Sequence, residues 1–160
     1  MPNSRSRNPT PAPARAPARI RVLCVDDSRD ITEQLGQCIA MQPDMESVGS
    51  LSSANNLRAE LEKLRPDVVL LDIAMPGVDP LEAVRELTDA ARAVPGASPG
   101  GSGCGAARVI VFSGSGDKKA VVSAADAGAW GFVCKDAEIP VILGAIREVA
   151  CGKVAFGRWL

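Results

Sequence analysis

Four short apolar runs, each ending in a polar residue, place the strongest constraint on how this chain can fold. Their sequences are IRVLCVDD, VVLLD, RVIVFS and WGFVCK, and they lead into Asp26 and Asp27, Asp72, Ser113 and Lys135. Runs of this length that are rich in Val, Ile and Leu are typical of buried strands. Parallel strands bring their carboxyl ends to one edge of an α/β sheet, where ligands bind. We therefore expect three carboxylates, a hydroxyl and an ammonium to meet in one cleft.

The remainder of the chain alternates such strands with helical patterns. Apolar residues recur at helical spacing in the first helix, at Ile31, Leu35 and Ile39, and Ser28 precedes them as a capping residue. The pattern predicts strands near residues 20–26, 45–50, 67–72, 108–113 and 130–134, and helices near 28–41, 54–64, 80–91, 117–127 and 138–151. This alternation predicts one (βα)5 domain built around a parallel sheet.

Composition narrows the classes of function that fit. The chain has 160 residues, of which 46% are hydrophobic and 3% aromatic, so a core of Val, Leu, Ile and Ala is expected. A net charge of −1 provides no basic face broad enough to predict DNA binding. Five separated cysteines without a CxxC pair, and the absence of histidine, argue against a disulfide framework and a zinc site. A reduced, cytoplasmic protein without membrane attachment is the simplest interpretation.

Two segments fall outside the alternating pattern. Residues 1–19 are rich in Pro, Ala and Arg and contain no acidic residue, which predicts a disordered tail. Residues 92–107 contain five glycines and two prolines and are expected to form a flexible insertion in the domain at 20–155. Residues 156–160 are interpreted simply as the C-terminal end.

Five motifs in order resemble the response regulator receiver domain, the phospho-acceptor half of bacterial two-component signalling. They are VDDS, LLDIAMPGVDPLEA, VIVFSG, AGAWGFVCKD and LGAIREVACG, and together they cover residues 20–155. The Lys-Asp pair and the last helix are most similar to the NarL-type subfamily. The resemblance implies a flavodoxin-like, doubly wound (βα)5 fold, with five parallel strands in the order 2-1-3-4-5.

The resemblance also implies a metal site and a nucleophile. Asp72 matches the acceptor aspartate, which is expected to form an aspartyl phosphate. The implied ligands of Mg²⁺, or of Mn²⁺ in its place, are Asp26, Asp27, Asp72 and the backbone carbonyl of Ala74. Chemistry alone favours such a cation, because three clustered carboxylates repel one another strongly without one.

Three further residues take their roles from the same resemblance. Lys135 and Ser113 are expected to contact the phosphoryl oxygens. Ser113 and Phe132 correspond to the switch pair, in which the aromatic ring turns inward as the hydroxyl is drawn toward the phosphoryl group. Plain packing of Phe132 explains its position equally well from the sequence.

The implied partners are a sensor histidine kinase or histidine phosphotransfer protein, and an unknown output protein at the face formed by residues 117–151. A phosphorylation-dependent homodimer is left open. The expected chemistry is self-catalysed phosphotransfer followed by slow autodephosphorylation, rather than conventional enzyme turnover. Neither DNA binding nor a membrane contact is expected of this chain.

Other interpretations remain beside a stand-alone receiver. The chain stops at Leu160 without the helix-turn-helix of NarL-type regulators, so a receiver fragment of a longer DNA-binding regulator is one alternative. An unphosphorylated pseudo-receiver that serves only as an interaction module is another, although the complete set of site residues counts against it. An aspartate-dependent phosphatase fits less well, because Ala74 stands where its second acid would be needed.

Overall fold

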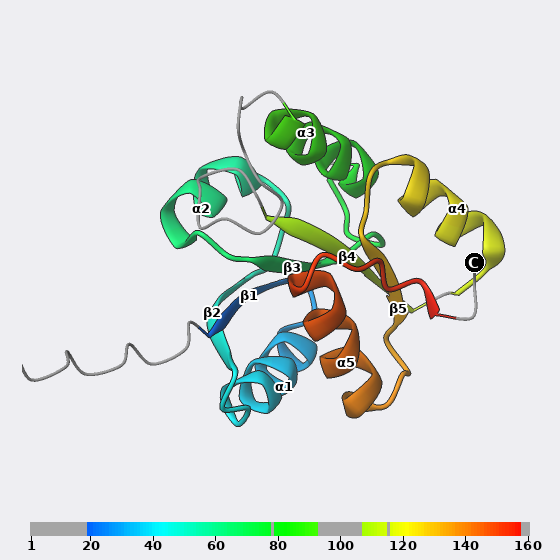
Figure 1. The fold of residues 1–160 in the computed structure, drawn as a ribbon. Coiled ribbons are helices and arrows are strands. Elements are labelled where there is room, and N and C mark those ends of the chain that lie inside the picture. The colour runs from blue at the N-terminus through cyan, green and yellow to red at the C-terminus, as the bar shows by residue number, and fades with distance from the viewer. Residues whose placement is uncertain (1–18, 78, 93–106, 115, 158–160) are drawn as a thin grey trace, which may run out of the picture.

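A computed structural model describes residues 19–77, 79–92, 107–114 and 116–157 (Figure 1). Most of the tail predicted at 1–19 and of the insertion predicted at 92–107 lies outside these residues, and Arg92 is the last residue of a helix. The described elements follow the predicted alternation of strand and helix. They are β1 (Ile20–Val25), α1 (Arg29–Ala40), β2 (Met45–Leu51), α2 (Leu57–Leu64), β3 (Val68–Asp72), α3 (Pro80–Arg92), β4 (Arg108–Ser113), α4 (Lys118–Asp126), β5 (Gly131–Cys134) and α5 (Ile139–Ala150).

The five strands form one parallel sheet in the order β2-β1-β3-β4-β5, so the predicted fold class and strand order are confirmed. The chain winds outward from β1 in both directions, first to β2 and then through β3 and β4 to β5. In the described residues, no helix is long and apolar enough to cross a lipid bilayer.

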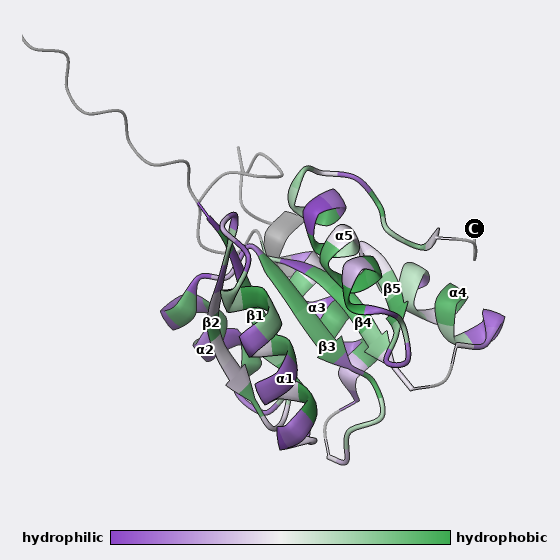
Figure 2. Ribbon diagram, turned by 90° about the horizontal axis from the view of Figure 1, so that it is seen from below, coloured by the Kyte–Doolittle hydropathy of each residue, from purple (hydrophilic) through white to green (hydrophobic). Residues whose placement is uncertain are grey.

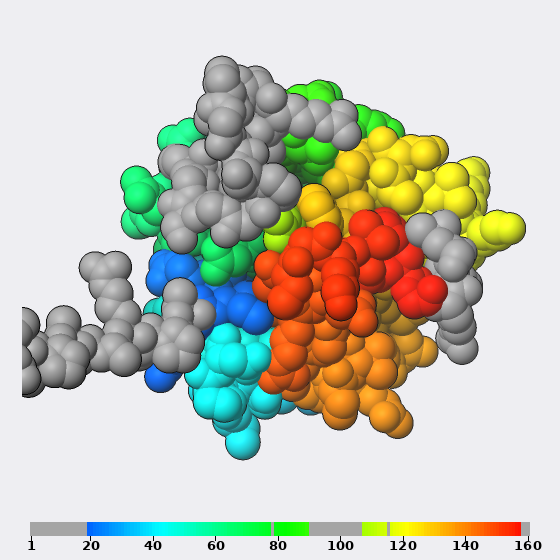
Figure 3. Space-filling model, in the orientation of Figure 1, coloured from blue at the N-terminus to red at the C-terminus, as the bar shows by residue number. Residues whose placement is uncertain are grey.

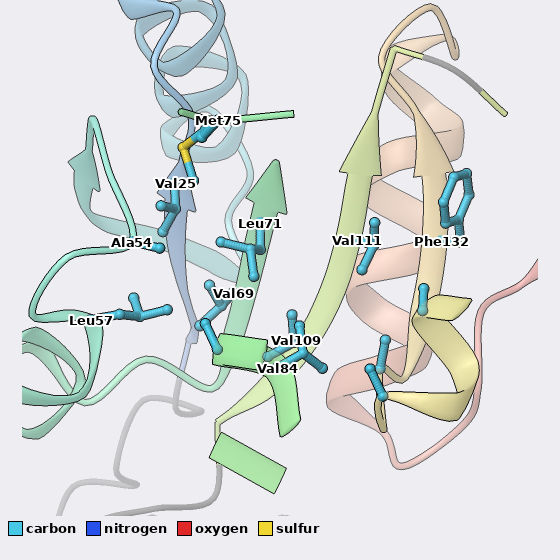
Figure 4. Close-up of a cluster of buried hydrophobic side chains, with 14 of the residues drawn as sticks. Val25, Ala54, Leu57, Val69, Leu71, Met75, Val84, Val109, Val111 and Phe132 are labelled. Carbon is cyan, nitrogen blue, oxygen red and sulfur yellow. The ribbon is translucent and has the colours of Figure 1, made fainter. Parts of the chain in front are cut away.

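Helices cover both faces of the sheet and create two separate cores (Figures 1 and 2). Alternate strand residues point to opposite faces, so Val69 and Leu71 pack toward α2, α3 and α4, whereas Val68 and Leu70 pack toward α1 and α5. All four side chains are at most 1% exposed. This two-sided burial explains why β3 is apolar up to its last residue. Figure 4 shows the core on the side of α2, α3 and α4.

Helix starts differ from the sequence-based prediction at two places. The second helix begins at Leu57 rather than near residue 54, because Asn56 has a φ of 57° and cannot continue a right-handed helix. Ser28 occupies the N-cap position of α1, but within the described residues its side chain forms no capping hydrogen bond. Its backbone N–H instead donates to Asp26 Oδ1 at 2.8 Å. Pro80 opens α3, at a first-turn position that suits proline because no backbone N–H donor is needed there.

The Arg108 side chain stabilises the C-terminus of α5 at the amino edge of the sheet. Arg108 begins β4 and is 5% exposed, and its Nη1 donates to the carbonyls of Val149 at 2.8 Å and Ala150 at 3.1 Å. Its guanidinium also lies 4.6 Å from the centroid of the Trp130 ring. A buried cation at the negative end of the α5 dipole, stacked on an aromatic face, is electrostatically favourable. Trp130 therefore has a packing role in the fold.

Candidate functional site

The polar ends of four strands meet at the carboxyl edge of the sheet. Strand register brings this about, because Val25 pairs with Leu71 and Ser113 pairs with Cys134 across the parallel ladders. Residues that directly follow or end neighbouring strands consequently lie side by side. Asp26 and Asp72 come from the central strands, as the sequence predicted.

Three carboxylates form a compact cluster at this edge. Asp26, Asp27 and Asp72 each place one carboxylate oxygen within 4.8 Å of the other two. Asp26 is 3% exposed and Asp72 is 1% exposed, whereas Asp27 is exposed to solvent. Carboxylates in such proximity repel one another, and burial strengthens this repulsion by lowering the local dielectric. The cluster needs positive charge to persist in its ionised form.

Lys135 supplies part of that positive charge. Its Nζ lies 2.6 Å from Asp26 Oδ2 and 3.0 Å from Asp72 Oδ2, and the side chain is 20% exposed. Burial opposes the charged ammonium, but the hydrogen bonds and negative charges of Asp26 and Asp72 outweigh it and raise the pKa of Lys135. Lys135 is therefore a permanent cation at neutral pH, and one ammonium between three carboxylates leaves the cluster negative.

The oxygen atoms of the cluster divide their bonding between backbone amides and cations. Asp26 Oδ1 accepts the Ser28 N–H at 2.8 Å, and Asp72 Oδ1 accepts the Ala74 N–H at 2.9 Å. Asp26 Oδ2 is buried and lies 2.6 Å from Lys135 Nζ. Three carboxylates with one ammonium between two of them keep net negative charge, which suits a further cation. Hard oxygen donors of this kind fit Mg²⁺.

Ser113 and Phe112 complete the wall of the site on β4. Ser113 is 4% exposed, and its carbonyl accepts the backbone N–H of Lys135 at 2.8 Å, which ties the end of β5 to the end of β4. The Phe112 ring centroid lies 5.9 Å from Lys135 Nζ. Sequence reasoning overlooked Phe112 and the two amides of Ser28 and Ala74. Only their position beside the acidic residues could have signalled these contacts.

Phe132 lies on β5, three residues before Lys135. The ring is 3% exposed and belongs to the core under α4, where Val121 and Ala124 are also buried (Figure 4). The ring therefore lies inward, in the orientation that was expected of the switch after phosphorylation. Its assignment as a switch remains a prediction, because burial alone also describes a packing residue.

The cysteines among the described residues are free thiols, and Cys24 is the buried one. Burial and, to a lesser extent, the charge of Asp26 raise the pKa of Cys24 to about 12, so this thiol stays protonated at neutral pH. Cys24 packs as a small apolar side chain, as predicted from its place in a strand. Cys38, Cys134 and Cys151 are also free thiols among the described residues.

Comparison with known proteins agrees with this geometry. The family model of the response regulator receiver domain matches residues 22–147. The nitrate/nitrite response regulator protein NarL of Escherichia coli K12 is 32% identical over 139 residues, which cover 87% of this chain and 58% of NarL. A protein-glutamate methylesterase/protein-glutamine glutaminase of a Nocardioides species is 36% identical over 135 residues, or 81% of this chain and 32% of that protein. The chain thus spans about half the length, or less, of these relatives.

Solved structures show the same fold. The response regulator domain of Thermotoga maritima CheB has a TM-score of 0.68 at 27% identity, covering 83% of this chain and 97% of that one. A LuxR-family two-component response regulator from Aurantimonas has a TM-score of 0.74 at 24% identity, covering 88% and 91%. The family match, the sheet order and the clustered acids lead to one conclusion: the chain belongs to the response regulator receiver domain family.

Proposed function

We propose that Asp72 accepts a phosphoryl group from a phosphohistidine of a sensor histidine kinase or histidine phosphotransfer protein. The observation that carries this proposal is the buried Asp72 carboxylate, held by the Ala74 amide and contacted by Lys135 at 3.0 Å. A carboxylate oxygen of Asp72 forms the new O–P bond while the N–P bond of the phosphohistidine breaks, and the imidazole leaves with the bonding electrons. Slow attack of water on phosphorus then returns the free carboxylate.

The acidic cluster supports a divalent metal in this reaction. Asp26, Asp27 and Asp72 would hold Mg²⁺, or Mn²⁺ in its place, together with the backbone carbonyl of Ala74. When bound, the metal supplies positive charge against the phosphoryl oxygens and relieves repulsion within the cluster. The three carboxylate oxygens within 4.8 Å of one another are the strongest support for this assignment.

Lys135 and Ser113 would hold the phosphoryl oxygens after transfer. Lys135 Nζ already lies 3.0 Å from the acceptor oxygen Oδ2 of Asp72, so a small rotation is sufficient for it to reach a phosphoryl oxygen. The Ser113 hydroxyl would donate to another oxygen. Phosphoryl transfer depends mostly on such positioning and charge neutralisation, so few covalent steps are needed from the protein.

The output in this proposal is a protein contact at the face formed by α4, β5 and α5, within residues 117–151. Ser113 and Phe132 would form the switch, since both lie on the strands that connect the site to that face. Both an unidentified output protein at this face and a phosphorylation-dependent homodimer are consistent with output through this face. The free thiols support placing the protein in the reducing cytoplasm.

We propose a stand-alone receiver, because the described residues form a single α/β unit that can act through its own surface. A second candidate is the receiver part of a NarL-type DNA-binding regulator, which the 32% identity to NarL favours. The mass of the protein isolated from its native cells separates the two. A value near 16.6 kDa supports the first candidate, and a clearly larger value supports the second.

Phosphoryl transfer is tested with radiolabelled acetyl phosphate. Wild type should incorporate label that hydroxylamine and alkali release in Mg²⁺ and lose this labelling in EDTA, whereas Asp72→Asn should stay unlabelled in both. Asp126→Asn is the matched control, because Asp126 is an exposed acid at the end of α4. Labelling of Asp72→Asn to the level of wild type would contradict the assignment of the acceptor.

A further inference from the structure

The C-terminal segment 153–157, here called the strap, pairs with the outer edge of β5. The Ala155 N–H donates to the carbonyl of Trp130 at 2.8 Å, and the Phe132 N–H donates to the carbonyl of Ala155 at 3.0 Å. These two hydrogen bonds form a parallel bridge between Gly131 and Ala155. The strap therefore occupies two backbone hydrogen-bonding groups on the outer side of β5, at the start of that strand. In Figure 1 it is the red segment beside β5.

The strap extends both cores around the edge of the sheet. Ala155 is 5% exposed and packs with the core on the side of α1 and α5, whereas Phe156 is 6% exposed and joins the core that contains Phe132. Val154, by contrast, is 64% exposed. In the space-filling view the red strap lies on the surface between the orange of α5 and the yellow of α4 (Figure 3).

Gly131 is shaped to receive the strap. A Cβ added at Gly131 would lie 2.8 Å from the carbonyl oxygen of Ala155 and 3.2 Å from its Cβ, and the three nearest atoms to that Cβ all belong to Ala155. Gly131 does not have the positive φ that would explain a glycine by backbone conformation. The close approach of the strap is therefore the physical reason for glycine at this position.

The strap can dock and undock at modest cost. Gly152 precedes the strap and Gly157 is its last residue, with φ values of 86° and 55°, so the chain bends at both ends of the strap. Two backbone hydrogen bonds and the burial of one aromatic ring stabilise the docked strap. The loss of conformational entropy on ordering these few residues opposes docking with a free energy of similar size. Short segments with this balance open locally without global unfolding.

We propose that the strap positions Phe132, so that docking of Phe156 and Ala155 favours the inward ring and thereby favours phosphorylation at Asp72. The Phe132 backbone is bonded to the strap, its ring shares a core with Phe156, and its strand leads directly to Lys135 in the site. The inference rests on the proposed function of Asp72. By linkage, a phosphoryl group at Asp72 tightens the strap, and loosening the strap weakens binding at Asp72.

Two substitutions loosen the strap by different means. Gly131→Ala places a methyl group against Ala155, and Phe156→Ala removes the buried ring. Gly144→Ala on α5 is the control for the first, because an added Cβ there meets nothing within 4 Å. Val154→Ala, at an exposed position of the strap, is the control for the second. Phe156→Leu should keep most of the wild-type behaviour that Phe156→Ala loses, because leucine retains an apolar side chain at this position.

The experiment uses the full chain with fluorophenylalanine at its three phenylalanines, titrated with beryllofluoride in Mg²⁺. Both strap variants should speed amide exchange at Ala155 and Phe132, shift the fluorine resonance of Phe132 and weaken beryllofluoride binding roughly fivefold or more. The controls should resemble wild type. In wild type, beryllofluoride should slow exchange at Ala155.

The outcomes separate the two proposals. Faster exchange at Ala155 with unchanged beryllofluoride affinity and an unchanged Phe132 resonance overturns the role of the strap and leaves the phosphoryl acceptor intact. Failure of wild type to take label at Asp72 overturns the proposed function and this inference together. If one variant does not fold, the other carries the same comparison.

Discussion

The two edges of this sheet both bury charge, but they neutralise it differently. At the amino edge, Arg108 donates to two carbonyls at the end of α5 and stacks on Trp130. At the carboxyl edge, Asp26 and Asp72 share the single ammonium of Lys135.

The difference lies in what surrounds these charges. A helix C-terminus and an aromatic face are both attractive to a cation, so the fold itself stabilises Arg108. Asp26 lies beside two other carboxylates, and the one ammonium of Lys135 offsets only part of their mutual repulsion. A charge that the fold neutralises contributes to stability. A charge that the fold neutralises only in part favours the binding of an ion or ligand of opposite charge. We therefore expect the carboxyl edge to be the functional edge, and the predictions below test this contrast.

The largest effect is expected at Lys135. Replacing it with Ala removes the only ammonium in contact with Asp26 and Asp72 among the described residues, so labelling of Asp72 by acetyl phosphate should slow on the order of 100-fold or more. Rates of label incorporation measure this, with Lys119→Ala as the control because Lys119 is exposed on α4. Labelling of Lys135→Ala at the wild-type rate would show that the metal alone provides enough positive charge.

A smaller effect, on stability rather than on chemistry, is expected at Arg108. Arg108→Ala leaves the carbonyls of Val149 and Ala150 without their donor and should lower the free energy of unfolding by about 2 kcal/mol. Urea denaturation measures the loss, and the rate of Asp72 labelling should not change. Arg108→Lys should recover only part of the stability, since an ammonium does not reproduce the planar guanidinium. A parallel loss of labelling would mean that the two edges are coupled.

The smallest effect is expected at an exposed ion pair near the amino edge. Hydrogen bonds from Arg147, at 2.8 Å and 3.0 Å, hold the pKa of the Asp44 carboxyl below its ordinary value of 3.8. A carboxyl whose folded pKa is depressed stabilises the protein above its unfolded pKa, and this contribution disappears as the pH falls through the folded pKa.

Arg147→Gln should therefore return the pKa of Asp44 toward 3.8, as followed by NMR titration of its carboxyl carbon. Stability near pH 7 should change little, because solvent and salt screen an exposed pair. Arg85→Gln on the exposed side of α3 serves as the control. An unchanged titration of Asp44 in Arg147→Gln would show that the pair does not persist in solution.

Much of the fold was predictable because its signals are local. The apolar runs of β3 and β4, the helical spacing on α1 and the acids after β1 are visible within a few residues of sequence. Helix boundaries were less certain, and the left-handed conformation of Asn56 is one reason. The strap was missed altogether. Its Ala155 and Phe156 look like an unremarkable end of the chain until β5 is placed beside them.

The sequence by itself determined the order of strands and helices, the parallel sheet and the identity of the acids at its carboxyl edge. Alternation of apolar runs and the fixed direction of parallel strands suffice for that. Only the tertiary structure decided that Lys135 lies between Asp26 and Asp72 and that the strap closes the edge of β5. Both are contacts between residues far apart in the chain or on different elements, and their geometry depends on packing that no local pattern encodes.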